Sequence, residues 1–344
     1  MKKLIAVLSA AAMTLSLAAC GSTATVSSAA SSSGETASSA ETTTTADAQH
    51  YKIAIVQQLD HSSLDEIRTA VEAQLEARAA ADGFTVEYTE YNGQNDASTL
   101  NQIGTQVVDG GFNAVVPIAT LAAQTMVTAT EGLNMPVVYA AISDPEAAGL
   151  TDLPLVTGTS DALNTPFILD MMLAVNPDIQ TVGLLYSNSE TNSATPIAEA
   201  KAYLDEKGIA YVEKTGNTND EILSAVAALS DQVDAVFTPT DNVVMAAAAA
   251  VSEQLTAAGV PFYTGADSFV NEGAFTTCGV NYTELGTYTA DMLVDILTTG
   301  EVPEYHVMDG GIITVNTETA AALNIDYSVF STMANTVVEV TTAG

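Results

Sequence analysis

The sequence contains very few residues of several kinds. Its 344 residues include two cysteines, no tryptophan, three histidines, and eight Lys and Arg against 42 Asp and Glu. The two cysteines, Cys20 and Cys278, predict no disulfide framework. The histidines His50, His61 and His306 are scattered and lack metal-ligand spacing. Because phosphate binding requires clustered basic residues, this composition argues against a nucleic-acid partner.

Sequence motifs of catalysis are also missing. The chain has no G-x-S-x-G elbow, since G-T-S-D-A at 158–162 does not fit it, and it has neither G-x-G-x-x-G nor a P-loop. We therefore expect no enzymatic activity, no cofactor and no bound metal.

The first 20 residues have the pattern of an export signal. Lys2 and Lys3 form its charged start and Leu4–Leu17 its apolar stretch, which is too short to be read as a membrane span. L-A-A-C at 17–20 resembles a bacterial lipobox, which implies cleavage before Cys20 and acylation of its thiol; the alternative is an ordinary secretory signal. Residues 21–49 are mostly Ser, Thr and Ala, a composition that predicts a disordered tether.

The remaining chain, from residue 50, alternates strand and helix patterns. Strands are predicted at 51–57, 84–91, 113–118, 136–142, 181–186, 209–213, 234–238, 262–265, 274–280 and finally 312–315, with a short extended segment at 155–158, and helices at 62–81, 96–108, 120 onward, 163–175, 196–207, 219–230, 243–255 and 281–299. This alternation favours parallel sheets with helices on both faces. Since a body of this length tends to divide, we expect an α/β protein with two doubly wound lobes around a ligand cleft.

Two stretches show the same design. D-A-V-F-T-P-T-D-N at 234–242 and N-A-V-V-P-I-A-T at 113–120 each run from a buried strand through a proline to a polar residue before a helix. Ligands of such sheets bind beyond the carboxyl ends of the strands. We therefore expect Thr120 and Asp241 on opposite walls of one cleft.

The predicted strand ends carry hydroxyls, amides and carboxylates, but no Lys or Arg. A ligand carboxylate would then be held by Thr120, Ser143 and free N–H groups at helix N-termini, and an ammonium by Asp241. Together these residues predict a site for a zwitterion, although each polar residue alone could simply cap a helix. Besides Thr120, Ser143 and Asp241, the candidate ligand-binding residues are Gln57, Asp144, Ser160, Asp161, Ser187, Asn188, Glu190, Asn192, Thr240, Asn242 and Asp267.

Seven stretches, in order over about residues 51–330, resemble one protein family. They are V-Q-Q-L-D-H-S-S-L-D (56–65), A-T-L-A-A-Q (119–124), S-D-P (143–145), T-G-T-S-D (157–161), Y-S-N-S-E-T-N-S (186–193), P-T-D-N (239–242) and V-N-Y-T-E-L-G (280–286). They look like those of substrate-binding lipoproteins of ABC importers similar to the tryptophan/aromatic amino-acid (TrpX-type) binding proteins. Three positions depart from the family pattern: Leu121 replaces Pro, Ser143 replaces Thr and Asp267 replaces Glu.

The resemblance implies a type I periplasmic-binding-protein fold. It implies an N-terminal lobe of residues 50–161 with 283–309 and a C-terminal lobe of 162–282 with 310–335. The chain would cross between them near 159–163, 281–283 and 309–312. The family also implies that His61, the one candidate base beside Asp60 and Asp65, caps the first helix or lines the cleft instead.

The function implied is capture of an amino acid, aromatic in character, and its delivery to an ABC permease and ATPase by a protein anchored on the outer face of the membrane. Tyr139, Tyr186, Tyr263 and Phe269 lie near strand ends and are candidates to frame a ring, or else to form lobe core. Two alternatives stay open: a binding lipoprotein of the same fold for a sugar or nucleoside, and a surface sensor or adhesin with a protein partner.

Overall fold

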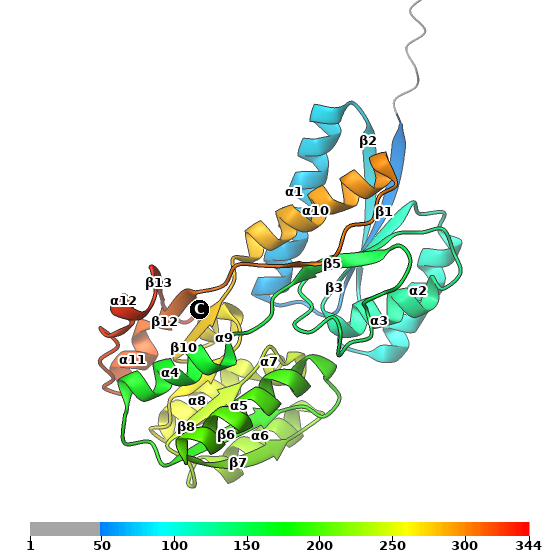
Figure 1. Cartoon of the computed structure of the whole chain (residues 1–344). Coiled ribbons are helices and arrows are strands. Elements are labelled where there is room, and N and C mark those ends of the chain that lie inside the picture. The colour runs from blue at the N-terminus through cyan, green and yellow to red at the C-terminus, as the bar shows by residue number, and fades with distance from the viewer. Residues whose placement is uncertain (1–48, 344) are drawn as a thin grey trace, which may run out of the picture. The chain divides into compact units, whose positions relative to one another are not determined.

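The computed structural model describes residues 49–343, so the export signal, Cys20 and nearly all of the predicted tether lie outside the described residues. The described chain contains two sheets (Figure 1). We call the first sheet and its helices the N-terminal lobe, and the second sheet and its helices the C-terminal lobe.

The sheet of the N-terminal lobe is parallel and has the strand order β11-β5-β4-β3-β1-β2. Ile53 and Ile55 of β1 belong to the same apolar cluster as α1, whereas Ala54 and Val56 pack with α2 and α3. Consecutive side chains of a strand point to opposite faces, so this uninterrupted apolar run requires helices on both sides. The elements are β1 (His50–Gln57), α1 (Ser62–Asp82), β2 (Thr85–Asn92), α2 (Ala97–Asp109), β3 (Ala114–Ile118), α3 (Thr120–Ala129), β4 (Val137–Tyr139), β5 (Val156–Ser160), α10 (Tyr282–Thr299) and β11 (His306–Val307).

The sheet of the C-terminal lobe has the order β13-β12-β10-β9-β8-β6-β7. Phe237, Tyr263 and Phe275 fill its core without solvent exposure. The elements are α4 (Thr165–Val175), β6 (Thr181–Tyr186), η1 (Thr191–Ser193), α5 (Ala194–Lys207), β7 (Ala210–Thr215), α6 (Asn219–Leu229), β8 (Ala235–Thr238), α7 (Asn242–Met245), α8 (Ala248–Ala257), β9 (Phe262–Thr264), α9 (Asp267–Asn271), β10 (Thr276–Gly279), β12 (Ile312–Asn316), α11 (Thr317–Ala322), α12 (Phe330–Met333) and β13 (Thr336–Val340).

The chain passes between the two sheets at three places, after β5, after β10 and after β11 (Figure 1). The expected fold class is confirmed: two mostly parallel sheets with alternating helices. Because both sheets present the carboxyl ends of their parallel strands where the chain crosses, the loops after these strands form the walls between the lobes.

The structure corrects three details of the predicted elements. The strand at 312–316 is not the last, because β13 at 336–340 extends the sheet, and β12 runs antiparallel to β10. The single helix predicted at 243–255 is two helices, α7 and α8, because the chain tightens at Ala247, whose N–H bonds the Val244 carbonyl three residues back. The run of alanines there contains no Gly or Pro, so the pattern gives no sign of the break.

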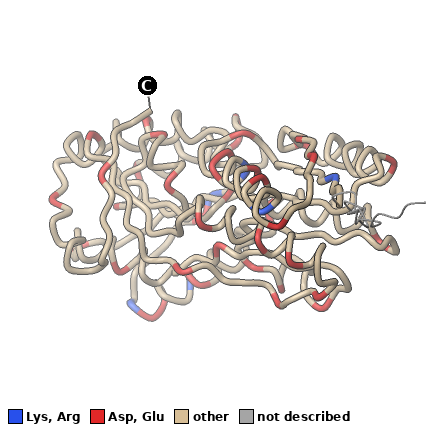
Figure 2. The backbone as a smooth tube through the Cα atoms, turned by 90° about the horizontal axis from the view of Figure 1, so that it is seen from above, with Lys and Arg blue, Asp and Glu red and all other residues tan. Residues whose placement is uncertain are grey.

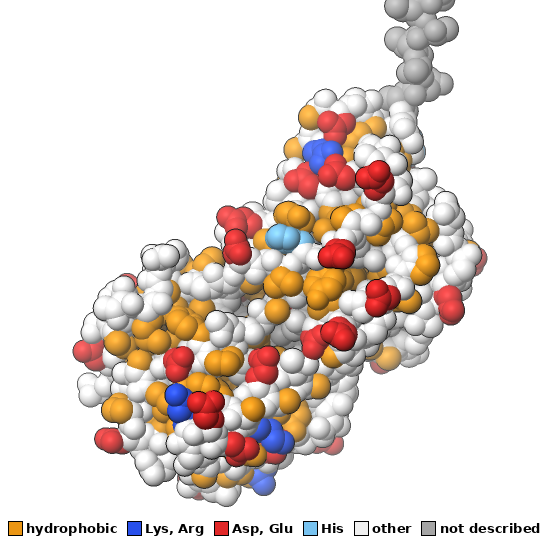
Figure 3. All heavy atoms as spheres, in the orientation of Figure 1, with side chains coloured by type: hydrophobic (Ala, Val, Ile, Leu, Met, Phe, Trp, Pro, Cys, Tyr) orange, Lys and Arg blue, Asp and Glu red, His pale blue; other side chains and the backbone are white. Residues whose placement is uncertain are grey.

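Acidic residues greatly outnumber basic ones, and they are spread over the whole described chain. Asp and Glu occur along the whole described chain, whereas Lys and Arg are few (Figure 2). On the face in Figure 3 the basic side chains lie near acidic ones. In the part of the chain that the structure describes, no helix has both the length and the apolar character needed to cross a membrane.

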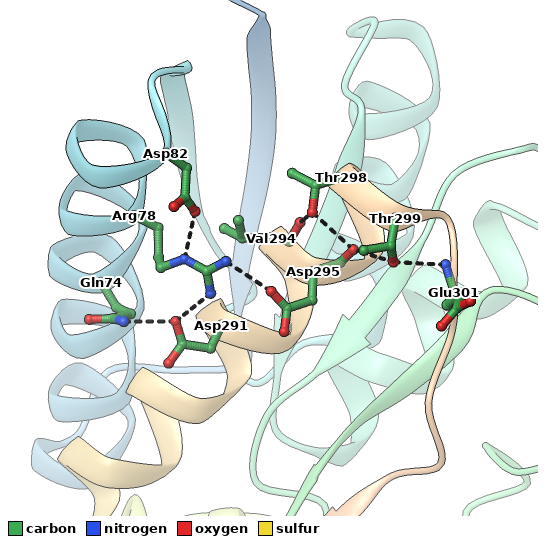
Figure 4. Close-up of polar contacts among 9 residues, drawn as sticks. All are labelled: Gln74, Arg78, Asp82, Asp291, Val294, Asp295, Thr298, Thr299 and Glu301. Carbon is green, nitrogen blue, oxygen red and sulfur yellow. Dashed lines mark hydrogen bonds and ion pairs between the residues drawn. The ribbon is translucent and has the colours of Figure 1, made fainter.

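Arg78 joins α1 to α10, the two helices that pack side by side on the N-terminal lobe (Figure 4). Its guanidinium lies 2.8 Å from Asp82 on its own helix, 2.9 Å from Asp291 and 2.8 Å from Asp295 on α10. The guanidinium and the three carboxylates form a network. An ion pair at the surface contributes more to stability in such a network than it does alone.

We predict that Arg78→Ala lowers the free energy of unfolding by about 1 kcal/mol, because three carboxylates lose their common partner. The loss should shrink in 0.5 M salt, since the Debye length then falls well below 10 Å. Urea titrations at low and high salt measure this. Lys214→Ala is the control, because the Lys214 side chain has no ion pair or cation–π contact within the described residues. Equal losses for both variants would refute the network.

Candidate functional site

A cavity lies between the lobes and is lined from both walls; the empty space among its lining residues is about 400 Å³, part of which is open to solvent. The loops after β1, β3, β4 and β5 form one wall, and those after β6, β8 and β9 form the other, with the start of α10 beside them. Parallel strands that end in short polar loops produce this arrangement. The lining residues are His61, Ser63, Leu64, Ala119, Thr120, Ala141, Ser143, Asp161, Asn192, Thr240, Asp241, Asn242, Met245, Ala266, Ser268, Phe269 and Tyr282.

Hydrogen bonds between side chains connect the two walls around this cavity. The hydroxyls of Ser143 and Thr240 lie 2.9 Å apart, and Ser63 Oγ donates to Asp267 Oδ1 at 2.9 Å. Gln58 Nε2 donates to Glu190 Oε1 at 3.1 Å. The segments after β1 and β4 are thereby held against those after β6, β8 and β9, and none of these contacts requires a basic residue.

Seven of the predicted site residues line the cavity: Thr120, Ser143, Asp161, Asn192, Thr240, Asp241 and Asn242. The other seven lie around it. Glu190 and Asp267 take part in the bonds between the walls, and Asp144 Oδ2 accepts from Thr195 Oγ1 at 2.6 Å. Gln57, Ser160, Ser187 and Asn188 bond to neighbouring loops: Gln57 Nε2 to Asp65, Ser160 Oγ to the Ser143 carbonyl, Ser187 Oγ to Asn217 and Asn188 Nδ2 to Thr215.

Asp241 has no solvent exposure and accepts four hydrogen bonds from the C-terminal lobe. Oδ1 accepts from the N–H groups of Val243 and Val244, which makes Asp241 the N-cap of α7, and Oδ2 accepts from Ser187 N and Ser193 Oγ at 2.7 Å each. Burial raises the pKa of Asp241, and these bonds oppose the rise. Asp241 therefore holds the loops after β6 and β8 together, a role that its position before a helix suggests.

Asp161 is the cavity carboxylate with fewer partners. Its Oδ1 accepts from Ser143 Oγ at 3.1 Å, and the side chain also contacts Tyr282. Burial raises the pKa of Asp161 to about 6, against the opposing hydrogen bond from Ser143. A buried carboxylate in this state gains from any cation placed beside it.

Glu190 accepts hydrogen bonds from two amides, and the one from Gln58 connects the lobes. Gln58 Nε2 donates to one oxygen, and Asn242 Nδ2 donates to the other at 2.8 Å. Burial, together with the charge of nearby Asp241, raises the pKa of Glu190 to about 7. Among residues 49–343 no Lys or Arg forms an ion pair with Glu190, so Glu190 loses its charge near neutral pH by binding a proton.

The start of α3 is a candidate anion-binding position. Its N-cap, Ala119, has a φ of 76° and offers no side-chain cap, so N–H groups of the first turn are left for other acceptors. The N–H of Leu121 already donates to Gln58 Oε1 at 3.0 Å. Ala141, on the next strand end, also has a positive φ of 58°. Such strain in non-glycine residues costs about 1–3 kcal/mol and is concentrated at functional sites.

Sequence reasoning missed part of the apolar lining. Leu64, Met245 and Tyr282 face the cavity beside Phe269, which is the one predicted aromatic residue found there. Tyr139 and Tyr263 are fully buried, and Tyr186 is half-buried with its hydroxyl on Glu213. Leu64 and Tyr282 open helices whose apolar periodicity gives no reason to separate them from core residues.

Metal-ligating side chains do not gather in the described range 49–343, where no group of three or more His, Cys, Asp or Glu could hold an ion. His61 lines the cavity as the N-cap residue of α1, without a side-chain cap bond. Burial lowers the pKa of His61 to about 4, so its imidazole is neutral at physiological pH. What this cavity can do is bind a small molecule through hydroxyls, carboxylates and apolar surface.

We predict that the unliganded protein loses stability between pH 6 and pH 8, because Glu190 must ionise while buried. For a carboxyl whose pKa is raised on folding, the stabilisation is complete below the unfolded value near 4.5 and is lost as the pH rises through the folded value of about 7. The lowered pKa of His61 makes stability rise with pH instead, but this effect is confined to pH values below about 6.5. The fall that Glu190 causes between pH 6 and pH 8 should be about 1.4 kcal/mol.

Glu190→Gln should flatten this dependence, and urea denaturation at pH 6, 7 and 8 measures it. Asp205→Asn, at an exposed position on α5, is the matched control. If the variant and the wild type lose the same stability between pH 6 and pH 8, Glu190 is not the titrating group.

Comparisons with a family model and with known proteins point to the same family. Residues 52–337 match the family model described as ABC transporter substrate binding protein. A tyrosine-binding protein of Clostridioides difficile is 27% identical over 289 residues, which cover 82% of this chain and 83% of that protein.

Solved structures agree. The complex of an ABC domain with L-Trp from Streptococcus pneumonia is 30% identical, with a TM-score of 0.78, and covers 84% of this chain and 100% of that one. A ligand-free, open substrate-binding protein with adhesive properties from Clostridium difficile is also 30% identical, with a TM-score of 0.65, and covers 85% of this chain and 100% of that one. The family model spans most of the described chain, and so the chain belongs to the ABC transporter substrate-binding proteins, which are extracytoplasmic proteins of the type I periplasmic-binding-protein fold and not enzymes.

Proposed function

We propose that this protein captures a free aromatic amino acid between its lobes and delivers it to an ABC permease. The observation that carries this proposal is the cavity lining, which combines buried carboxylates, an uncapped helix N-terminus and apolar side chains, and has no Lys or Arg among its residues. A site that offers negative charge and neutral donors side by side suits a zwitterion.

The ammonium group is placed beside Asp161. The sequence suggested Asp241, but the oxygens of Asp241 already accept four hydrogen bonds, whereas Asp161 accepts from Ser143 and contacts Tyr282. Asp241 lies in the same lining and adds its field to that of Asp161. An ammonium there supplies the cation that both buried carboxylates lack.

The ligand carboxylate is placed at Thr120 and the first turn of α3. A helix N-terminus carries about half a positive charge, and this one has no side chain of its own to cap it. Thr120 and Ser143 add hydroxyl donors from neighbouring strand ends. Neutral donors suffice because the neighbouring ammonium balances the charge.

The apolar part of the lining suits an aromatic side chain. Leu64, Met245, Phe269 and Tyr282 form an apolar section between the polar groups. Two relatives bind aromatic amino acids, one tyrosine and one L-Trp. At equal identity the structure agrees better with the L-Trp complex than with the open, ligand-free relative, which supports a lobe arrangement close to the bound one.

The lobes are proposed to part and close about the three crossings, since ligand entry requires the bonds between the walls to break. No specific observation favours a sugar or nucleoside as the ligand. The sugar-binding structural neighbours are 15–16% identical to this chain and share the fold alone. The adhesin alternative is supported only by one relative with adhesive properties.

Asp161→Asn should weaken binding of the preferred amino acid by about 3 kcal/mol, because a buried ammonium loses its charged partner. Thr120→Ala should cost less, about 1–2 kcal/mol, since backbone donors remain. Calorimetry with tryptophan, tyrosine, phenylalanine and branched-chain amino acids measures both. Asp170→Asn, on exposed α4 surface, is the control. Undiminished affinity in Asp161→Asn would show that the ammonium lies elsewhere.

We also propose that the mature protein is a lipoprotein held at the outer face of the cell membrane, where its permease and ATPase partners act. L-A-A-C before a Ser- and Thr-rich stretch supports this. A single acyl chain gives only reversible binding, so stable anchoring needs further lipid on Cys20.

Cys20→Ser should move the protein from the membrane fraction to the soluble fraction or leave its signal uncleaved. Fractionation with mass spectrometry of the N-terminus tests this, and Cys278→Ser, which changes a buried thiol of the folded part, serves as control. Membrane association that survives Cys20→Ser would contradict the lipoprotein proposal.

A further inference from the structure

Glu190 belongs to the C-terminal lobe, but a residue of the other lobe helps to close it off from solvent. It lies in the loop between β6 and η1 and is only 6% exposed. One carboxyl oxygen accepts from Asn242 Nδ2 of its own lobe at 2.8 Å, and the other accepts from Gln58 Nε2 of the N-terminal lobe at 3.1 Å. Parting the lobes breaks the second bond and admits water to that side of the carboxyl group.

Gln58 connects this carboxyl group to the place proposed for the ligand carboxylate. Its Oε1 accepts from the N–H of Leu121, in the first turn of α3, at 3.0 Å. Its Nε2 donates to Asn95 Oδ1 at 2.8 Å as well as to Glu190. Because a backbone N–H can only donate, the amide oxygen of Gln58 faces α3 and its NH2 group faces Glu190. One side chain therefore joins the start of α3 to the opposite lobe.

The groups around Glu190 favour its neutral form when the lobes are closed. Desolvation, together with the charge of Asp241 from the loop after β8, raises the pKa of Glu190 to about 7. After β1, His61 is neutral because burial lowers its pKa to about 4, and Asp60 is exposed. Before α2, Asp96 is exposed as well. The loop at 187–193, α3 and α7 contain no other charged residue.

We propose that closing the lobes takes up a proton at Glu190, so that the protein holds its ligand more tightly in mildly acidic surroundings and releases it more readily above neutral pH. This inference rests on the proposed function, and specifically on closure of the lobes around the ligand. With the lobes apart, water reaches the Gln58 side of the carboxyl group, and Glu190 ionises closer to the ordinary range of a glutamate. A group whose pKa is higher in the closed state favours closure below that pKa, and this contribution is lost as the pH rises through about 7.

Calorimetry at pH 6, 7 and 8 tests the proposal, with L-tryptophan, L-tyrosine and L-phenylalanine as probes on the full folded protein. For the probe that binds most tightly, the ratio of Kd at pH 8 to Kd at pH 6 should be up to about tenfold larger in the wild type than in Glu190→Gln. At pH 7 the wild type should take up about half a proton more than the variant on binding. The dependence of the binding enthalpy on the ionisation enthalpy of the buffer measures this number.

The comparison with Glu190→Gln separates Glu190 from the other titrating groups. His61, Asp161 and the ligand's own ammonium titrate in both proteins, so the difference between the proteins reports Glu190. Glu190→Ala, which removes the carboxyl group outright, is a second variant with the same expected loss. Glu253→Gln makes the matched change at an exposed position on α8 and should keep the pH profile of the wild type. Circular dichroism verifies that every variant is folded.

The outcomes separate this inference from the proposed function. If an amino acid binds and the wild type and both Glu190 variants show the same pH dependence and the same proton count, the inference is overturned and the proposed function stays in place. A wild type that takes up fewer protons than the Glu190 variants also overturns it, because closure would then favour the ionised form. If none of the three amino acids binds, the proposed function fails and this inference fails with it.

Discussion

The walls of the cavity meet through hydroxyls, amides and carboxylates, and no basic side chain stands in the lining. This constraint organises the rest of the site. Asp161, Glu190 and Asp241 are all buried, and desolvation raises the pKa of each; no Lys or Arg in the part of the chain that the structure describes forms an ion pair with them. Asp241 is held by hydrogen bonds without an ion pair, and the same bonds join the loops after β6 and β8. A ligand that brings its own cation therefore completes the charge balance instead of displacing an existing ion pair.

The polar contacts between the walls also relate ligand binding to closure of the lobes. The bonds of Ser143 with Thr240, Ser63 with Asp267 and Gln58 with Glu190 join residues that sit on different lobes and border the cavity. These are modest interactions, each worth about 0.5–1.5 kcal/mol, or somewhat more where a charge takes part. They can be broken to admit a ligand and reformed around it, so the ligand's contacts with both walls decide which arrangement prevails.

Much of the fold was predictable from the sequence, because strand and helix periodicities are local. The apolar run of β1 and the polar ends of β3 and β8 were enough to expect parallel sheets and a site at their carboxyl ends. Half of the predicted site residues line the cavity. What local patterns could not give is contact between residues that are distant in sequence. The bonds of Asp241 with Ser187 and Ser193, the bond of Gln58 with Glu190, and the lack of partners at His61 Nδ1 and Ser268 Oγ among residues 49–343 all depend on the folded structure. The positive φ of Ala119 could not be predicted, because alanine rarely adopts this conformation. The strand β13 was missed because the stretch before it shows no clear strand periodicity.

The central claim is that the cavity binds a free aromatic amino acid, and a thermal-shift screen of amino acids, sugars and nucleosides on the full folded part of the protein tests it most directly. An aromatic amino acid at 100 times its Kd should stabilise the protein by about 2.7 kcal/mol and raise its melting temperature, whereas sugars and nucleosides should have no effect. A melting temperature that rises with a sugar or nucleoside and stays constant with every amino acid at millimolar concentration would contradict the account.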